Sequence, residues 1–145
     1  MEFKPNIVHF SGHGARDGIV VLDDHEQAQL LSPEMLHKIL ATSGVSVTCV
    51  VLNASYSDSF FKSISDVVRY IIAVEGTLSD TAHLKFSLGF YEALAGGYNI
   101  LQAFSVGCTC VELENTEHRG KFRLYQSDLS TRRVEVSETL EANSA

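Results

Sequence analysis

Short apolar runs alternate with polar and glycine-containing segments along the chain. Runs rich in β-branched and aromatic residues predict strands over 6–10, 19–22, 45–52 and 70–74. Apolar residues that recur at spacings of three and four predict helices after the second, third and fourth of these strands. Strands and helices in this order are typical of an α/β fold, in which right-handed crossovers connect a mainly parallel sheet.

Capping residues mark the start of the first predicted helix. Ser32 supplies a capping hydroxyl, and Pro33 suits the first helical position because its missing N–H needs no partner there. Leu36, Ile39 and Leu40 then make the apolar face of this helix.

Two longer helices follow the last of the four strands. We expect Asp80 to cap the first of them, Gly96 to follow its end, and Asn99 to cap the second. Apolar and polar residues then alternate at 122–124 and 134–136, which predicts two short antiparallel or edge strands.

Composition is typical of a soluble globular domain. The 145 residues are 45% hydrophobic and 20% charged, which is enough apolar material to bury a core. The net charge of −7 argues against nucleic-acid binding, because a basic face is needed to replace phosphate counterions. No apolar run approaches the roughly 18 residues of a membrane span, and the N-terminal segment lacks the apolar core of a signal peptide. We therefore expect a cytoplasmic protein that contacts neither membrane nor nucleic acid.

The cysteines and histidines give no sign of a metal or cofactor. We interpret residues 1–136 as one domain and the polar segment 137–145 as a disordered tail. Cys49, Cys108 and Cys110 lie in apolar stretches without the spacing of a zinc site, which predicts buried free thiols. The histidines lack the paired spacing of metal ligands.

Two strand ends carry residues that could cooperate in nucleophilic catalysis. His13 follows the first predicted strand, and Ser55 follows the strand at 45–52. Neighbouring parallel strands end at the same edge of a sheet, so a base and a nucleophile would lie within hydrogen-bonding reach there. The backbone N–H of Gly14 could hold an oxyanion, because glycine lets a substrate carbonyl come close. We interpret His9, in mid-strand, as a core or supporting histidine.

Three segments match the motifs of one known family in order and spacing. They are Ile7-Val8-His9-Phe10-Ser11-Gly12-His13-Gly14, then Val51-Leu52-Asn53-Ala54-Ser55, and then Leu78-Ser79-Asp80 with the Gly89 to Gly97 stretch. Together, over residues 5–110, they resemble the CHAT domains, which are caspase-like cysteine peptidases related to separase.

The resemblance implies a caspase–haemoglobinase-like three-layer sandwich and a cysteine–histidine dyad. By it, His13 is the base, Ser55 takes the nucleophile position, and Gly14 supplies an oxyanion N–H. Asp80 takes the place of an acid that faces the residue before the scissile bond, which favours arginine or lysine there. The implied partner is a protein or peptide substrate, in bacterial defence or regulated cell death.

The sequence departs from this family in two ways. Complete CHAT domains have strands before the histidine motif, so we expect an upstream domain or a second chain to complete the fold. Serine also stands at residue 55, where the family has cysteine. A thiol has a pKa of about 8.5 and can be held as a thiolate beside histidine, whereas a hydroxyl has no accessible anion. We therefore expect this chain to be inactive as a peptidase.

Several alternatives stay open for these residues. Ser55 is explained either by a deliberate change from cysteine, which the otherwise intact motif favours, or by a natural pseudoprotease that binds a peptide without cutting it. A serine hydrolase is disfavoured, because the Gly-x-Ser-x-Gly elbow is missing. In structural terms alone, His13 could be a turn residue, and Ser55 and Asp80 could be helix caps.

Overall fold

Two β-sheets form from the apolar runs of the sequence. In this computed structural model, which describes residues 5–11, 13–15, 17–42, 47–55, 58–127 and 133–136, the larger sheet has five strands. Their order is β1 (Ile7–Ser11), β5 (Cys49–Ser55), β6 (Tyr70–Val74), β7 (Phe122–Ser127) and β8 (Arg133–Val136). β1, β5 and β6 are parallel, whereas β7 and β8 each run antiparallel to the strand before them.

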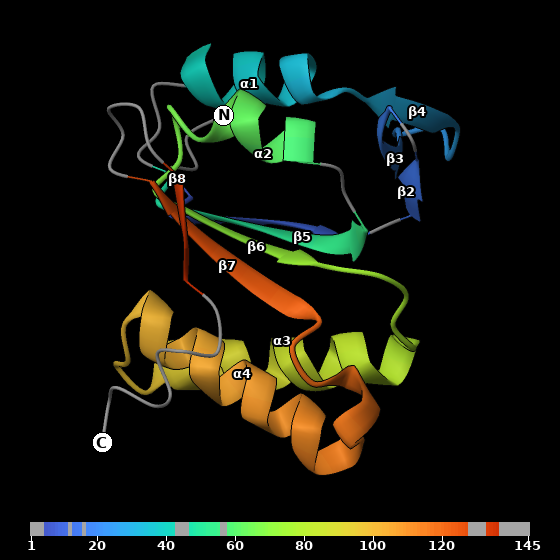
Figure 1. The fold of residues 1–145 in the computed structure, drawn as a ribbon. Helices are drawn as coiled ribbons and strands as arrows, with labels where there is room; N and C mark the ends of the chain where they lie inside the picture. The colour runs from blue at the N-terminus through green and yellow to red at the C-terminus, as the bar shows by residue number, and fades with distance from the viewer. Residues whose placement is uncertain are drawn as a thin grey trace.

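Helices cover both faces of this sheet (Figure 1). α1 (Pro33–Thr42) and α2 (Asp58–Ile64) lie on one face, and α3 (Asp80–Ala95) and α4 (Ile100–Glu114) lie on the other. A turn of 3-10 helix, η1 (Thr116–His118), follows α4. The predicted α/β fold and the two late antiparallel strands are therefore confirmed. Among the described helices, none has both the length and the apolar character that a membrane crossing requires.

A smaller antiparallel sheet lies beside the larger one. It consists of β2 (His13–Ala15), β3 (Gly18–Leu22) and β4 (Ala28–Leu31). Only β3 was predicted, because β2 has three residues and β4 buries only its last residue, so neither shows an apolar pattern. Gly18 is required where β3 meets β4, since a Cβ there would lie 2.2 Å from the Leu31 carbonyl oxygen.

The two faces of the sheet bury separate apolar clusters. Cys49 and Val51 of β5 pack toward α3 and α4, whereas Val50 and Leu52 pack toward α1 and α2. All four residues are at most 1% exposed, and this burial on both faces explains their continuous apolar run. The strand begins at Cys49 and ends at Ser55. The predicted bounds of 45–52 were therefore wrong at both ends, because residues 47 and 48 precede the strand; residues 43–46 lie outside the described part of the chain.

The start of α1 follows the prediction, but one of its apolar residues does not. The Ser32 hydroxyl oxygen accepts a hydrogen bond from the backbone N–H of Met35 at 3.2 Å, and Pro33 is the first helical residue. Leu36 and Leu40 are buried, whereas Ile39 is 53% exposed. The prediction for Ile39 was wrong because only Leu36 and Leu40, which lie four residues apart on one side of α1, are buried in this short helix.

The cap of α3 also differs from the prediction. Ser79 is the N-cap, and its hydroxyl accepts from the backbone N–H of Ala82 at 3.2 Å; Asp80 is the first helical residue. The cap of α4 is as predicted. Asn99 and Gln102 form a capping box, in which each side chain accepts from the other residue's backbone N–H.

Two glycines let α3 and α4 approach closely. A Cβ on Gly107 would lie 2.8 Å from the ring of Phe86, and one on Gly89 would lie 2.7 Å from the sulfur of Cys110. The Phe86 ring in turn stacks on Phe122 of β7, with centroids 4.0 Å apart and planes 8° apart. This contact fixes the first half of α3 against the start of β7.

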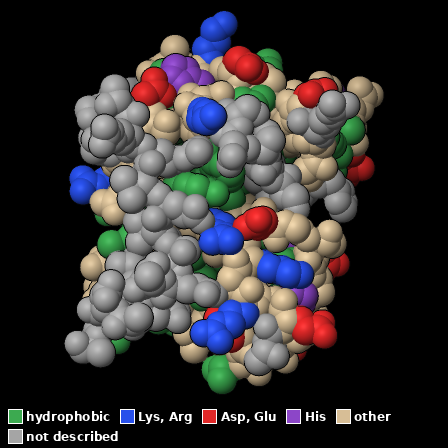
Figure 2. All heavy atoms as spheres, viewed as in Figure 1, with side chains coloured by type: hydrophobic (Ala, Val, Ile, Leu, Met, Phe, Trp, Pro, Cys, Tyr) green, Lys and Arg blue, Asp and Glu red, His purple; other side chains and the backbone are tan. Residues whose placement is uncertain are grey.

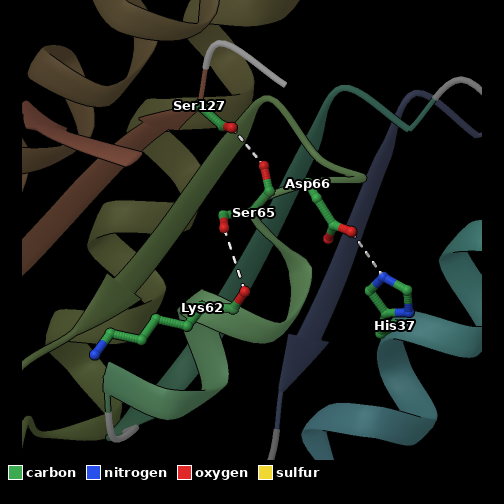
Figure 3. Close-up of polar contacts among 5 residues, drawn as sticks. All are labelled: His37, Lys62, Ser65, Asp66 and Ser127. Carbon is green, nitrogen blue, oxygen red and sulfur yellow. Dashed lines mark hydrogen bonds and ion pairs between the residues drawn. The ribbon is translucent and has the colours of Figure 1, made fainter. Parts of the chain in front are cut away.

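Polar contacts join the elements at the opposite end of β6, as Figure 3 shows. His37 Nε2 of α1 lies 3.1 Å from a carboxylate oxygen of Asp66, in the turn after α2. The hydroxyl of Ser127, at the end of β7, donates to the carbonyl of Ser65 in the same turn. The turn is thus attached to both a helix and the sheet.

Candidate functional site

The strand register brings the two predicted reactive positions to one edge of the sheet. β1 and β5 are adjacent and parallel, with Ser11 opposite Asn53. His13 lies two residues beyond Ser11, and Ser55 lies two residues beyond Asn53. β2, which contains His13, is in contact with β5, whose tip points toward it in Figure 1. The backbones of both residues therefore lie at the carboxyl edge, where α/β folds gather functional groups; their side chains are outside the described structure.

The end of β5 is irregular at this point. Leu52 pairs with Ala73 of β6, but the next pair joins Ser55 to Val74, so β5 accommodates two additional residues. Such irregularities bend a strand and redirect side chains, and they are frequent next to active sites. Residue 55 thus follows the irregularity, where β5 resumes its pairing with Val74 of β6. This shift could not be predicted from the residues of β5, because it depends on the register of β6.

Gly14 and Asp80 lie on the segments that leave this edge. Gly14 pairs with Ile19 in the smaller sheet and is exposed. Asp80 follows the loop after β6 and is also exposed. Four predicted positions (His13, Gly14, Ser55 and Asp80) therefore belong to chain segments that leave the same edge of the parallel strands or end there.

His9 makes a contact that the sequence did not reveal. Its Nδ1 lies 2.7 Å from the hydroxyl oxygen of Tyr91 on α3, and the two rings stack with centroids 5.7 Å apart. Burial lowers the pKa of His9, and nearby His83 lowers it further. Burial also raises the pKa of Tyr91 to about 12, with a smaller contribution from Cys49. The interpretation of His9 as a core or supporting histidine agrees with this geometry.

A second histidine lies close to the start of α3. Burial lowers the pKa of His83, and His118 contributes in the same direction, whereas Asp80 opposes the shift. The ring of His83 meets the ring of Phe122 edge-on, with centroids 6.2 Å apart. Across the described ranges, no three histidine, cysteine or acidic side chains are grouped so that they could hold a metal ion.

Charged side chains of both signs lie on the surface of the described residues (Figure 2). On the face drawn in Figure 2, acidic and basic side chains of the described residues are interspersed and are not gathered by sign.

No model of a protein family matches the chain, and a search of curated proteins likewise found no match.

Proposed function

We propose that this domain is a caspase-like peptidase domain of the CHAT type, with its site at the carboxyl edge of β1 and β5. The observation that carries the proposal is the parallel register of these two strands, which supports a base at His13 beside a nucleophile at residue 55. The α/β sandwich is compatible with a caspase–haemoglobinase fold, which an upstream domain or a second chain would complete. The proposed place of action is the cytoplasm.

The proposed reaction is hydrolysis of a peptide bond by a cysteine at position 55. His13 removes the thiol proton, and the thiolate attacks the peptide carbonyl carbon. Backbone N–H groups of Gly14 and residue 55 stabilise the oxyanion. His13 then gives its proton to the departing amine, and water hydrolyses the thioester to restore the thiol. No cofactor takes part in this scheme.

The proposed substrate is an extended segment of a partner protein with arginine or lysine before the cut. Asp80 supports this choice, because it is exposed and lies on the segment that follows β6 from the same edge. A carboxylate pairs well with a guanidinium group. The proposed setting, bacterial defence or regulated cell death, rests on the resemblance of the motifs.

Ser55 itself favours a second possibility, in which the natural chain binds such a peptide and does not cut it. A hydroxyl is a far weaker nucleophile than a thiolate at neutral pH. The two possibilities predict the same peptide preference and differ only in cleavage.

The test compares the chain with its Ser55→Cys variant on fluorogenic peptides that end in arginine, lysine or aspartate. We expect cleavage after arginine or lysine by Ser55→Cys alone, and its loss in Ser55→Cys with His13→Ala. The cysteine variant with His25→Ala is the matched control, because His25 lies in an exposed turn between β3 and β4. Cleavage that survives His13→Ala would contradict the assigned base. Binding of these peptides without cleavage by Ser55→Cys would instead favour the pseudoprotease.

A further inference from the structure

The loop that carries the chain from β6 to α3 is attached to the start of β7. The backbone N–H of Glu75 donates to the Lys121 carbonyl at 2.7 Å. Two nitrogens of Arg123, Nε and Nη2, lie 3.0 and 2.9 Å from Oε2 of Glu75. The ammonium of Lys121 donates to the carbonyl of Thr77 at 3.1 Å. Four contacts from Lys121 and Arg123 thus hold the loop of five residues, 75–79.

The far end of this loop is equally well fixed. Ser79 caps α3 through the backbone N–H of Ala82, and the stacking of Phe86 on Phe122 holds the first turns of α3 against β7. Asp80 therefore follows a loop that is held along its length. Its backbone position is set by β7, a strand that contributes nothing to the pair of positions 13 and 55.

The two carboxylates at this edge, those of Glu75 and Asp80, differ in their ion-pair partners. The carboxylate of Glu75 is paired with Arg123. Asp80, by contrast, forms no salt bridge with any of the described residues and is exposed. Of these two carboxylates, Asp80 is the one available to a cationic ligand.

The Arg123–Glu75 ion pair should contribute little to the stability of the fold. The Glu75 side chain is 69% exposed and that of Arg123 is 32% exposed, and exposed ion pairs contribute little to the free energy of unfolding. Position matters more at a binding site, where a carboxylate displaced by about 1 Å loses much of its effect.

We propose that Arg123 and Lys121 are positioning residues that hold loop 75–79 and thereby set the place of Asp80 for a basic side chain of the bound peptide. This inference rests on the proposed function. It assigns the specificity of the site partly to β7, through two residues that touch neither the peptide bond nor the nucleophile.

The test uses the Ser55→Cys chain with Arg123→Gln, and kcat and KM are measured on two peptides that carry arginine or neutral citrulline before the cut. We expect Arg123→Gln to raise KM for the arginine peptide about 3- to 10-fold and to change kcat little. The citrulline peptide should be unaffected. Arg123→Lys keeps the charge and one donor, and should restore part of the preference.

Lys85→Gln is the matched control. It also removes one positive charge and one exposed pair, here with Glu114 at 3.6 Å, but it lies on the α3–α4 contact and not on the loop. Lys85→Gln should leave the preference for arginine unchanged. An equal loss on both peptides in Arg123→Gln would indicate a general structural role and overturn the inference, as would an unchanged preference.

Failure of the proposed function gives a different result. If Ser55→Cys cuts nothing, fluorescence anisotropy of the Ser55 chain with the same two peptides provides the second measurement. If the chain binds the arginine peptide preferentially and this preference falls in Arg123→Gln, the positioning role of loop 75–79 is supported and the proposed peptidase activity is contradicted. Cleavage without preference for arginine would overturn the role of the loop and the proposed basic specificity, while still supporting the peptidase. Binding without that preference would overturn the role of the loop and the basic specificity, and absence of both cleavage and binding would overturn both proposals.

Discussion

The Nδ1 atom of His9 lies 2.7 Å from the hydroxyl oxygen of Tyr91, and this hydrogen bond joins β1 to α3 across 82 positions of the sequence. His9 lies four residues before His13 on the segment that leads into the candidate site. The contact therefore supports the β1 end of that site from the helical layer below it.

Tyr91→Phe should lower the free energy of unfolding by about 1 kcal/mol, because a part-buried hydrogen bond to His9 is lost. Urea denaturation measures this change. Tyr98→Phe is the control, since Tyr98 is 54% exposed, and it should have almost no effect. Equal stability of the two variants would contradict a stabilising role for the His9 contact.

Stability should fall as the pH is lowered below about 6.5. The pKa of His9 and that of His83 are both lowered from 6.5 in the folded chain, so the unfolded state binds protons first. The stability that these neutral rings contribute is fully present above the unfolded value and is lost as the pH falls toward the lowered folded values. Thermal unfolding followed from pH 7.5 to pH 5 measures the slope.

The variant His9→Gln should flatten that slope, because glutamine does not titrate. His25→Gln, in an exposed turn, is the control for the loss of a histidine side chain. A slope that is the same in His9→Gln and in the parent would show that other groups cause the acid sensitivity.

Gly107→Ala should destabilise the chain by about 1–3 kcal/mol, despite the better helix propensity of alanine. The added Cβ would lie 2.8 Å from the Phe86 ring, which cannot easily move because it stacks on Phe122. Thermal denaturation measures the effect. Val106→Ala, at the adjacent and more exposed position of α4, is the control. A gain in stability for Gly107→Ala would mean that the two helices can separate at little cost.

Substitutions at Ser79 and Asp80 should have different effects, the first on stability and the second on peptide cleavage. Ser79→Ala removes the cap of α3 and should cost about 1 kcal/mol of stability. Asp80→Asn should change stability little, yet it should greatly reduce cleavage after arginine by the Ser55→Cys chain. Chemical denaturation and the peptide assay provide the two measurements. A large loss of stability in Asp80→Asn with unchanged cleavage would reverse the assignment.

Local signals predicted much of the fold. The strand at 70–74 was predicted with its observed bounds, because four of its five residues are buried and form a continuous apolar run. The caps at Ser32 and Asn99 depend on bonds to residues three positions away, so the sequence alone shows them. The positions of His13 and Ser55 at one edge followed from the alternation of strands and helices.

Contacts between distant residues could not be predicted in this way. β4 exposes most of its residues and forms only because β3 offers it a partner. The Arg123–Glu75 pair spans 48 positions, and neither residue type is unusual on a surface. Ser79 and Asp80 are both common capping residue types. The sequence therefore leaves open which of them is the cap, because the answer depends on a shift of one residue in the start of the helix.

The burial of Cys49 bears on how a thiol at residue 55 can be detected. Burial raises the pKa of Cys49 to about 12, and Cys108 is also buried, so neither should react readily with iodoacetamide at neutral pH. Cys110 is only partly buried, and the parent chain with Ser55 measures its background. Alkylation of Ser55→Cys above that background would then report the ionisation of the new thiol directly, before any substrate is known.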